Sequence, residues 1–521
     1  MNAESQAVMF ADVHLWQQPP APAAPVREAS EQRPAPRLQL VHRDQLVLRP
    51  VDVEHLLPPD HPARAIWKLV GGCDLSRFYE DIQAVEGAAG RPPLEPRLLI
   101  SLLLYGYQEG IPSCREIAKR CGYHPAYQWL TGAESVAAHT LSDFRTAHGE
   151  GLKALMVQVL ALLASEGLVD LQQVTQDGSK IRAAAGSDTF RREATLKKLT
   201  EQARQRVEQL ESEDSELVSQ RAIKARQVAA QERLQRLEKA QEELQKVQQS
   251  AEKPEQARVS TTDPEARIMK QNHDGGFAPS YNVQFTTDAK QTVIVSVEVT
   301  QAGSDAEQLQ AAMQRVKAEA GQAPQQVIAD AGYTSRDNVV AMALASIELI
   351  GPARDGEAQK ETSYKRRGVA PEFRAEAFAW DAEHNQYICP QGQRLPYQKK
   401  QTEVGQTKYI YAAGDADCAA CPQKGQCCPQ TRQRTIVRSE EGPEMVAFRS
   451  KMETPEAKQV YHKRGAVAEF PHACIKERYG LRQFSVRGLV KVKLEALWVA
   501  LTFNVQQWTR LCWKPQLARV T

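Results

Sequence analysis

Two acidic residues each follow a short apolar segment that is typical of a β-strand. Asp177 comes after Gln173-Val-Thr-Gln, and Asp330 comes after Gln326-Val-Ile-Ala. A glycine follows each acid closely, so we expect both strands to end there in a turn. Open α/β sheets carry functional groups at the carboxyl ends of their strands. The two carboxylates could therefore act together, although each alone could also be a simple turn-former.

A third acid lies near the C-terminal end, in a segment with a helical pattern. This segment contains Tyr461, Arg464, Glu469 and Lys476. At about 100° per residue, Glu469 and Lys476 share one helix face, and Arg464 lies on an adjoining face. A carboxylate flanked by cations suits a site that binds both metal and phosphate. Glu477 is the nearby alternative, but it lies between two cations, as residues of surface ion pairs do.

The distribution of charge points to a nucleic acid only locally. Over the whole chain, 66 Lys and Arg residues stand against 64 Asp and Glu residues, so net charge indicates no anionic partner. Between Arg449 and Lys493, however, eleven basic residues stand against four acidic ones. This excess is the footprint expected for a nucleic-acid backbone. The alternative, a solvated cationic helix face, would normally carry interspersed acids.

Cysteines form a second candidate site. A structural Zn²⁺ is one interpretation, and free buried thiols are the other. Disulfides are less favoured in a reducing compartment. The predicted zinc ligands are Cys389, Cys418, Cys421 and Cys427, with Cys428 as the alternative to Cys427. The other cysteines are predicted to be core residues, namely Cys73, Cys114, Cys121, Cys474 and Cys512.

The first part of the chain changes character near residue 46. Residues 1–45 contain six prolines and no apolar periodicity, which predicts a disordered tail. Residues 46–169 show helical patterns separated by short turns, including a helix capped by Ser113. Arg115, Lys119 and Arg120 on that helix suggest a DNA-binding domain, and a simple helical packing domain is the alternative.

The remaining elements must position the acids. Residues 170–350 alternate strands and helices after a β-hairpin at 281–300, which predicts an α/β domain with a mixed sheet. Residues 190–252 have apolar residues at helical spacing and form a helical insertion, either a hairpin within one chain or a dimerising coiled coil. Residues 351–445 contain the cysteines, and residues 446–510 carry the third acid.

These motifs together resemble a known family. The chain is similar to DDE-superfamily transposases of bacterial insertion sequences, and the similarity covers roughly residues 60–510. The matching pieces of the catalytic part are Asp177-Gly-Ser-Lys-Ile, Tyr281-Asn-Val-Gln, Ala329-Asp-Ala-Gly-Tyr, the Tyr461 to Lys476 signature, and Phe484-Ser-Val-Arg-Gly-Leu with its downstream Asn504. Those of the helical part are Arg91-Pro-Pro-Leu, Ser113-Cys-Arg and Thr140-Leu-Ser-Asp-Phe-Arg. One departure is Glu469-Phe-Pro-His-Ala, where the family commonly has Glu-Pro-Val-Phe-Gly.

The resemblance implies a fold and a mechanism. It implies an RNase H-like catalytic domain with a mixed sheet and a helical insertion, joined to an all-α N-terminal domain. Asp177 would bridge two divalent ions, Mg²⁺ or alternatively Mn²⁺, while Asp330 binds one and Glu469 the other. Water would cut the DNA strand, and the freed 3′-OH would attack target DNA. Tyr461, Arg464 and Lys476 would lie near phosphate.

The resemblance also implies partners and a cellular setting. The expected partner is double-stranded DNA, both the terminal inverted repeats of the element and its target, bound by a homodimer. No run of about 18 apolar residues and no apolar leader occurs, so we expect a cytoplasmic, nucleoid-associated protein without a membrane partner. The alternatives are a catalytically inactive, DNA-binding remnant or repurposed transposase, and a scaffold organised by residues 190–252.

Overall fold

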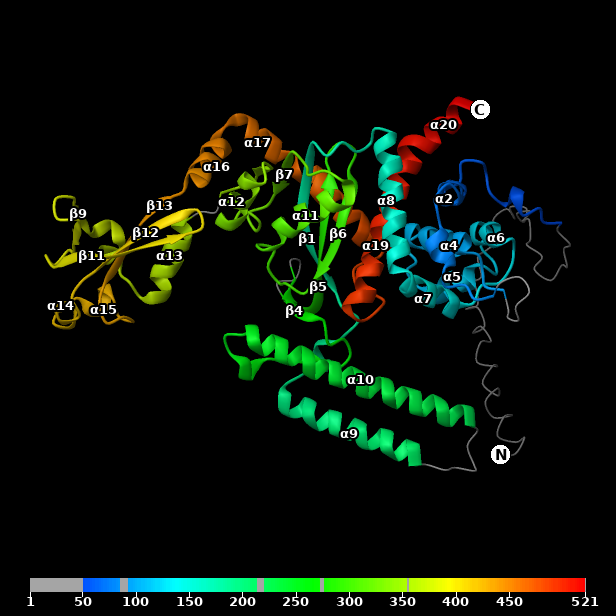
Figure 1. The fold of residues 1–521 in the computed structure, drawn as a ribbon, viewed down its shortest axis with the longest axis horizontal. Helices are drawn as coiled ribbons and strands as arrows, with labels where there is room; N and C mark the ends of the chain where they lie inside the picture. Colours follow the sequence, from blue (N-terminus) through cyan, green and yellow to red (C-terminus); the bar gives the residue numbers. More distant parts are fainter. Residues whose placement is uncertain (1–49, 85–91, 213–219, 272–275, 354–355, 521) are drawn as a thin grey trace, which may run out of the picture. The chain divides into compact units, whose positions relative to one another are not determined.

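The structure is a computed structural model that describes residues 50–84, 92–212, 220–271, 276–353 and 356–520 (Figure 1). The tail predicted for residues 1–45 lies outside the described residues. The described chain is a mixture of α-helices and β-sheets. Among its helices, no single one is long and apolar enough to span a membrane, although the bent pair Ala138–Ala147 and Gly149–Ser165 meets that criterion together.

A six-stranded mixed sheet carries the two acids that follow apolar segments. Its order is β4-β5-β1-β7-β8, and β6 also pairs with β5. Strands β4, β5, β6 and β1 pair antiparallel, whereas β1, β7 and β8 run parallel. The bounds are β1 Gln173–Arg182, β4 Arg267–Lys270, β5 Phe277–Asp288, β6 Val293–Thr300, β7 Gln326–Ala329 and β8 Glu348–Ile350. The pairing of β5 with β6 confirms the predicted hairpin.

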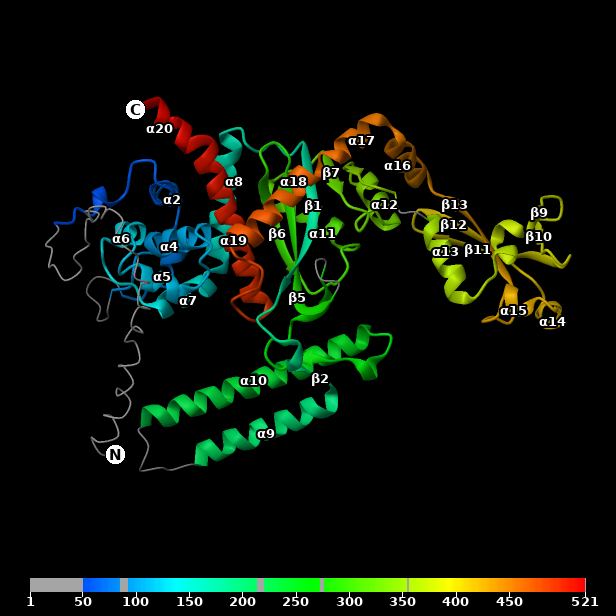
Figure 2. The same cartoon turned by 180° about the vertical axis from the view of Figure 1, so that it is seen from behind.

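Helices cover both faces of this sheet. Helix α11 (Gln308–Ala320) contacts β5 and β6 on one face, and α18 (Arg464–Ala473) contacts β1 and β5 on the other (Figures 1 and 2). The apolar segment before Asp330 forms β7, and Ser335 then caps α12 (Arg336–Leu344) by accepting a hydrogen bond from Asn338 N. Two layers of helix around a sheet bury the apolar strands from water.

A long apolar helix joins the sheet to the helical region. Helix α19 (Leu489–Trp508) is buried along most of its length and packs against β6, α4 (Pro96–Gln108) and α8 (Gly149–Ser165). A helix that is apolar all round must be enclosed on several sides. Residues from the helical region, the sheet and α19 therefore share one continuous hydrophobic core.

The helical region from residue 50 to 169 contains seven α-helices among the described residues. Besides α4 and α8 they are α2 Pro62–Gly71, α3 Ser76–Tyr79, α5 Cys114–Arg120, α6 Pro125–Thr131 and α7 Ala138–Ala147. The predicted cap of α5 is confirmed, because the Ser113 side chain accepts a hydrogen bond from Glu116 N. Arg145 of α7 is buried and lies 3.8 Å from the buried Glu495 of α19. The indole of Trp498 donates to the carbonyl of Arg145 at 3.1 Å.

The insertion after β1 consists of two long helices packed on each other. These are α9 (Glu193–Ser212) and α10 (Gln220–Ser250), next to a short pair of strands, β2 (Phe190–Arg191) and β3 (Val259–Ser260). Arg204 pairs with Glu238 at 3.0 Å, and Gln241 donates to Thr200 at 3.0 Å, so the helices run antiparallel. Their apolar stripes cover each other within one chain, as the hairpin interpretation predicts. The link at 213–219 lies outside the described residues.

The cysteine-containing segment has its own five-stranded antiparallel sheet, which the sequence had not indicated. The strand order is β13-β12-β11-β10-β9. The strands are β9 Ala379–Asp381, β10 Gln386–Ile388, β11 Arg394–Glu403, β12 Gln406–Ala412 and β13 Thr435–Glu441. The helices around and after it are α13 Gly356–Arg367, α14 Asp415–Ala419, α15 Lys424–Cys427, α16 Pro443–Glu453, α17 Pro455–His462 and the C-terminal α20 Lys514–Val520.

Candidate active site

The register of two parallel strands brings Asp177 and Asp330 side by side. Gln176 of β1 is the partner of Ala329 of β7, so the next residue on each strand is the acid. Neighbouring strands lie about 4.8 Å apart, so the two carboxylates share one end of the parallel pair. The carboxylate of Asp330 is one of the charges that act on Asp177.

The strand end expected at Asp177 is wrong, although the position of the acid is not affected. Strand β1 continues to Arg182, because β5 pairs with it from Val174 through Arg182. Only the pairing with β7 stops at Gln176. Asp177 is therefore the first residue beyond the parallel ladder, while the antiparallel ladder on its other side holds its backbone rigid.

Two cationic or basic side chains from α18 contact Asp177. The guanidinium Nη2 of Arg464 lies 3.2 Å from Asp177 Oδ2, and His472 Nε2 lies 3.7 Å from the same oxygen. The two residues are eight positions apart, or about two helical turns, so they occupy one face of α18. The His472 ring also meets the ring of Phe285, the β5 partner of Asp177, with centroids 5.1 Å apart.

Burial dominates the electrostatics of this cluster. It raises the pKa of the Asp177 carboxyl to about 6, against the opposing effect of the Arg464 guanidinium. Burial, together with the nearby cations of Lys476 and Arg464, lowers the pKa of His472 to about 3. His472 is therefore neutral at pH 7, and its Nδ1 is buried without a hydrogen-bond partner among the described residues. Such shifted groups in one place are typical of functional sites.

Lys476 approaches the same carboxylate from the end of the helix. Burial lowers its pKa, and the Asp177 carboxylate raises it, so the ammonium lies within the field of that acid. Lys476 belongs to a π-helical turn, Cys474–Arg478, that directly follows α18. Pro471 lies inside α18 and removes one backbone donor. π-Helical turns of this kind occur frequently at functional sites.

The third predicted acid lies on the same helix but is exposed. Glu469 is one helical turn before His472, and no ion pair joins it to another described residue. Glu477 behaves differently, since it forms an exposed ion pair with Arg482. The role of Glu469 as a ligand therefore stays a prediction, whereas Glu477 has a surface partner.

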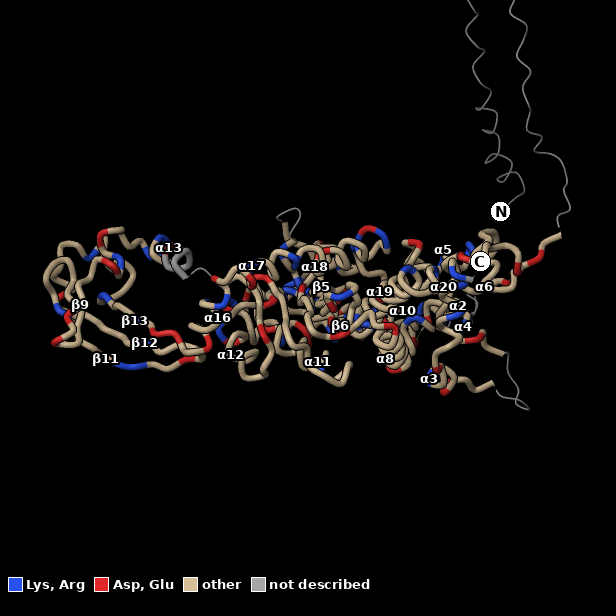
Figure 3. The backbone as a smooth tube through the Cα atoms, turned by 90° about the horizontal axis from the view of Figure 1, so that it is seen from above, with Lys and Arg blue, Asp and Glu red and all other residues tan. Residues whose placement is uncertain are grey.

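The other residues predicted to contact phosphate differ in how far they are engaged by neighbouring side chains. Tyr461 packs against the apolar cluster of Ile328 and Ile350 under β7 and β8. On α5, Arg115 and Lys119 are not engaged by any ion pair within the described ranges, whereas Arg120 pairs with Glu116 at 3.1 Å. Figure 3 marks the Lys and Arg residues along the chain, including those of the segment from α16 to the π-helical turn.

The cysteines predicted to bind zinc line one small cavity of about 30 Å³ together with Cys428. The backbone N–H of Gln393 donates to Cys389 Sγ at 3.2 Å, and that of Arg434 donates to Cys418 Sγ at 3.4 Å. The thiol of Cys428 interacts with those of Cys418 and Cys427. Burial raises the pKa of Cys427 to about 12. Backbone donors aimed at sulfur favour the thiolate, which is the form that binds metal.

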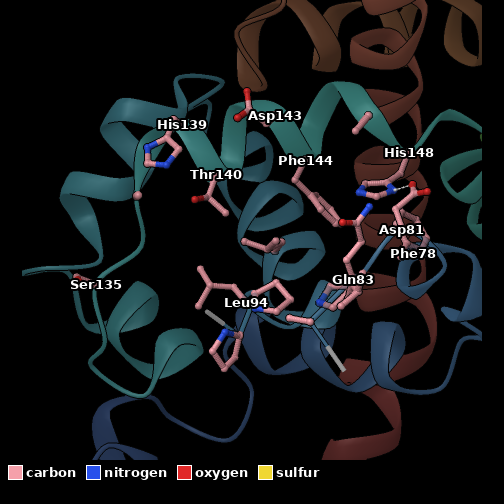
Figure 4. A pocket seen from close by; sticks show the side chains of 18 residues that line it. Phe78, Asp81, Gln83, Leu94, Ser135, His139, Thr140, Asp143, Phe144 and His148 are labelled. Carbon is pink, nitrogen blue, oxygen red and sulfur yellow. Dashed lines mark ion pairs between the residues drawn. The ribbon is translucent and has the colours of Figure 1, made fainter. Parts of the chain in front are cut away.

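A large cavity of about 910 Å³ lies in the helical region and contains none of the predicted site residues. Thr140, Asp143 and Phe144 line it, and His148 points toward Asp81 at 3.7 Å (Figure 4). Its lining residues flank the undescribed segment 85–91, so we assign it no ligand. We therefore consider the surroundings of Asp177 as the candidate site.

The oxygen atoms available at this site are of the type that binds a hard divalent cation. Asp177 and Asp330 offer carboxylate oxygens, which Mg²⁺ and Mn²⁺ prefer. Gly332 leaves room beside Asp330, because a Cβ there would lie 2.8 Å from Asp330 Oδ1. Within the described ranges, no three acidic, His or Cys side chains already meet at ligand distance, either here or at the cysteines. Glu469 would have to turn inward to complete the set.

The sequence did not indicate two residues, His472 at the site and Asp305 behind it on the opposite face of the sheet. His472 occurs in the motif that departs from the family pattern, and that departure was the available signal. Asp305 lies in the loop between β6 and α11, where its carboxylate pairs with Lys180 of β1 at 2.9 Å. No strand or helix periodicity marks a single loop acid, so nothing in the sequence distinguished it.

Comparisons with known proteins are consistent with the motifs. The model of a "Transposase DDE domain" matches residues 388–509, and that of a "Transposase domain (DUF772)" matches residues 51–147. The first match contains Glu469 and Lys476, whereas Asp177 and Asp330 lie outside both. Among curated proteins, none matches the chain.

The comparison with solved structures gives one weak match. It is a cryo-EM structure of the piggyBac transposase synaptic complex with hairpin DNA, with 8% sequence identity and a TM-score of 0.30. The similarity covers 86% of this chain and 75% of that chain.

Proposed function

Because the chain belongs among the DDE transposases of insertion sequences, we propose that it cuts the ends of its element and joins them to target DNA by phosphoryl transfer. The observation that carries this proposal is the register pair Gln176 and Ala329, which sets Asp177 and Asp330 next to each other. Arg464 of α18 adds a cation to this place, because its guanidinium lies 3.2 Å from Asp177.

We propose that the six-stranded sheet is an RNase H-like catalytic domain and that residues 46–169 are an all-α DNA-binding domain. The first assignment is supported by three antiparallel strands, β6-β5-β1, continued by the parallel strands β7 and β8. The second is supported by Arg115 and Lys119 on the surface of α5. We take the remaining boundaries as predicted, with the cysteine segment at 351–445 and the third acid in 446–510.

The acids would hold the catalytic metal. Asp177, Asp330 and Glu469 are the proposed ligands, and bound Mg²⁺ ions would activate the attacking oxygen and stabilise the leaving one. Arg464 has a planar fork suited to a phosphate oxygen pair, and Lys476 adds a point charge beside it. Neutral His472 and Phe285 exclude water from one side of Asp177. Tyr461 supports the start of α18 from the apolar cluster beneath it.

The proposed partners follow from this chemistry. The substrate is double-stranded DNA, both the terminal inverted repeats and the target, and a homodimer would hold the two ends. A cytoplasmic, nucleoid-associated location in a bacterial cell would give access to that DNA. A catalytically inactive remnant is less well supported, because Asp177, Asp330 and Glu469 are all present.

The test is strand cleavage of a duplex that carries the element end, with Mg²⁺. Asp177→Asn and Asp330→Asn should each abolish nicking and leave DNA binding within a few fold, since phosphate contacts dominate affinity. Asp337→Asn, an exposed acid on α12, is the matched control and should nick normally. Retained nicking in either site variant would refute the assignment.

We also propose a structural Zn²⁺ at the cysteines. Cys389, Cys418 and Cys421 are three ligands, and Cys427 or Cys428 is the fourth. The two backbone N–H donors to sulfur and the shared cavity support it. Metal analysis of the purified chain should give one zinc per chain, and the serine variant of the true fourth ligand, Cys427 or Cys428, should bind less zinc. Full zinc content in all serine variants, or none in the wild type, would reject the site.

A further inference from the structure

A buried polar network lies on the face of the sheet opposite Asp177. Side chains alternate between faces along a strand, so Lys180 of β1 points away from the Asp177 side. Its β5 partner Asn282 and the neighbouring Gln284 point the same way. Asp305, from the loop before α11, meets all three of these side chains. Its Oδ2 accepts from Lys180 at 2.9 Å, and its Oδ1 accepts from Asn282 and Gln284 at 2.7 Å each.

Gly178 allows this close approach. A Cβ at Gly178 would lie 2.6 Å from Asp305 Oδ1 and 2.4 Å from Gln284 Nε2. Real Cβ atoms do not come so close, so only glycine leaves room for the carboxylate directly behind the Asp177 peptide. The glycine that follows the first acid thus has a packing role on the far face of the sheet rather than the turn role expected from the sequence.

The same network reaches the second acid. Gln284 Oε1 accepts from the hydroxyl of Tyr333, which lies three residues beyond Asp330, at 2.5 Å. Asn338 of α12 donates to the carbonyls of Tyr333 and Ala306 at 2.7 Å each. Tyr333, Gln284 and Asn338 are almost fully buried. Asp305 is therefore linked to β1 through Lys180 and to the turn after β7 through Gln284.

The loop that carries Asp305 is also fixed at its start. The amide of Gln301 donates to the carbonyl of Glu265 at 2.6 Å and to the buried Glu243 of α10 at 3.4 Å. Glu243 in turn pairs with Lys246 at 2.7 Å. The helical insertion therefore helps to hold this loop against the sheet.

We propose that Asp305 is a positioning residue that holds the Asp177 and Asp330 strand ends in register from behind, through Lys180, Asn282 and Gln284. The metal-binding role of the two strand ends rests on the proposed function. The contacts by which Asp305 holds those strand ends do not depend on it. Asp305 is no ligand in this proposal, because its carboxylate is used on the opposite face. Its removal would leave the Lys180 ammonium partly buried without its acid, and would free the turn that carries Asp330.

The first test measures positioning alone, by amide hydrogen exchange of the full chain without added metal. Asp305→Ala should quicken exchange in the segment 326–334, and Asp305→Asn should have a smaller effect because it keeps an acceptor for the amides. Glu307→Gln, which changes an acid two residues away, should leave the segment unchanged. Unchanged exchange at 326–334 in Asp305→Ala would overturn the proposal.

The second test uses Mn²⁺ alone, followed by electron paramagnetic resonance. Asp305→Ala should weaken Mn²⁺ binding roughly 10- to 100-fold, as removal of a supporting group behind a metal ligand does. Adding Lys180→Met to that variant should restore part of the affinity, because it removes the unpaired cation. Equal binding by Asp177→Asn and wild type would instead refute the metal assignment in the proposed function, whatever the exchange result.

Discussion

Arg464 Nη2 lies 3.2 Å from Asp177 Oδ2, so the first of the three acids is already paired with a cation from α18. A metal ion on Asp177 and the guanidinium of Arg464 would compete for the same oxygen. DNA offers Arg464 a second anionic partner, because its fork also suits a phosphate. Binding of DNA would then release Asp177 for metal, which couples substrate binding to assembly of the site.

Substitution of Arg464 tests whether its guanidinium competes with metal for Asp177 and pairs with a DNA phosphate instead. Arg464→Met should tighten Mn²⁺ binding in the absence of DNA by about fivefold, a coupling of about 1 kcal/mol, because the competing cation is gone. Nicking of the element end should fall at the same time, since the phosphate no longer has its guanidinium partner. Lys463→Met changes the exposed neighbouring residue and should alter neither property. Weaker Mn²⁺ binding in Arg464→Met would contradict the competition.

The raised pKa of Asp177 predicts a pH-dependent stability. Burial raises this pKa from the ordinary 3.8 to about 6, so the folded state takes up a proton more readily than the unfolded state. The resulting stabilisation is complete below the unfolded value and is lost as pH rises through about 6. Compared with Asp177→Asn, the wild type should therefore gain up to about 3 kcal/mol of unfolding free energy between pH 7.5 and pH 4. Urea unfolding of both proteins at several pH values measures the difference, and a constant difference would count against the shift.

A matched pair of glutamates tests the third acid. Glu469→Gln should stop Mg²⁺-supported nicking, because loss of a metal ligand removes stabilisation of the transition state. Glu477→Gln should stay near wild type, because its exposed pair with Arg482 contributes under about 1 kcal/mol. A nicking assay of both variants decides between them. The reverse result would move the metal site two turns along the helix.

The proposed DNA-binding role of α5 is best tested by point substitutions rather than by a truncation. The helical region shares its core with α19, so deleting it would expose that core. Arg115→Ala with Lys119→Ala should weaken binding of element ends and reduce the salt dependence by about one unit for each phosphate that is no longer neutralised. Arg120→Ala should have a smaller effect, since Arg120 is already paired with Glu116. Lys153→Ala on α8 is the control, and an unchanged salt dependence in the double variant would remove α5 from the interface.

The hydrophobic pattern around the acids was sufficient to predict much of the site. Apolar strands before Asp177 and Asp330, the hairpin at β5 and β6, and the cap at Ser113 all depend on short stretches of sequence, and the structure has each of them. The length of β1 did not follow, because its second half is determined by pairing with β5 rather than by its own residues.

Two other features depend on contacts that sequence alone does not encode. Strand β11 is mostly exposed and charged, so it lacks the apolar alternation that marks a half-buried strand. The position of Asp305 depends on a missing Cβ at Gly178 and on three side chains from two strands. The secondary-structure propensity of a short segment does not indicate which distant segments it will contact.

The packing of α19 has a consequence for damaged copies of the gene. This helix belongs to the last part of the chain, yet it covers both the sheet and the helices α4 and α8, and its Glu495 pairs with Arg145 of α7. A frameshift or stop codon before codon 489 would remove it while leaving the reading frame of the helical region intact. The product would expose a large apolar surface and should be degraded. Under the proposed function, decayed copies of the gene that lose their 3′ end should therefore not persist as proteins that occupy the element ends.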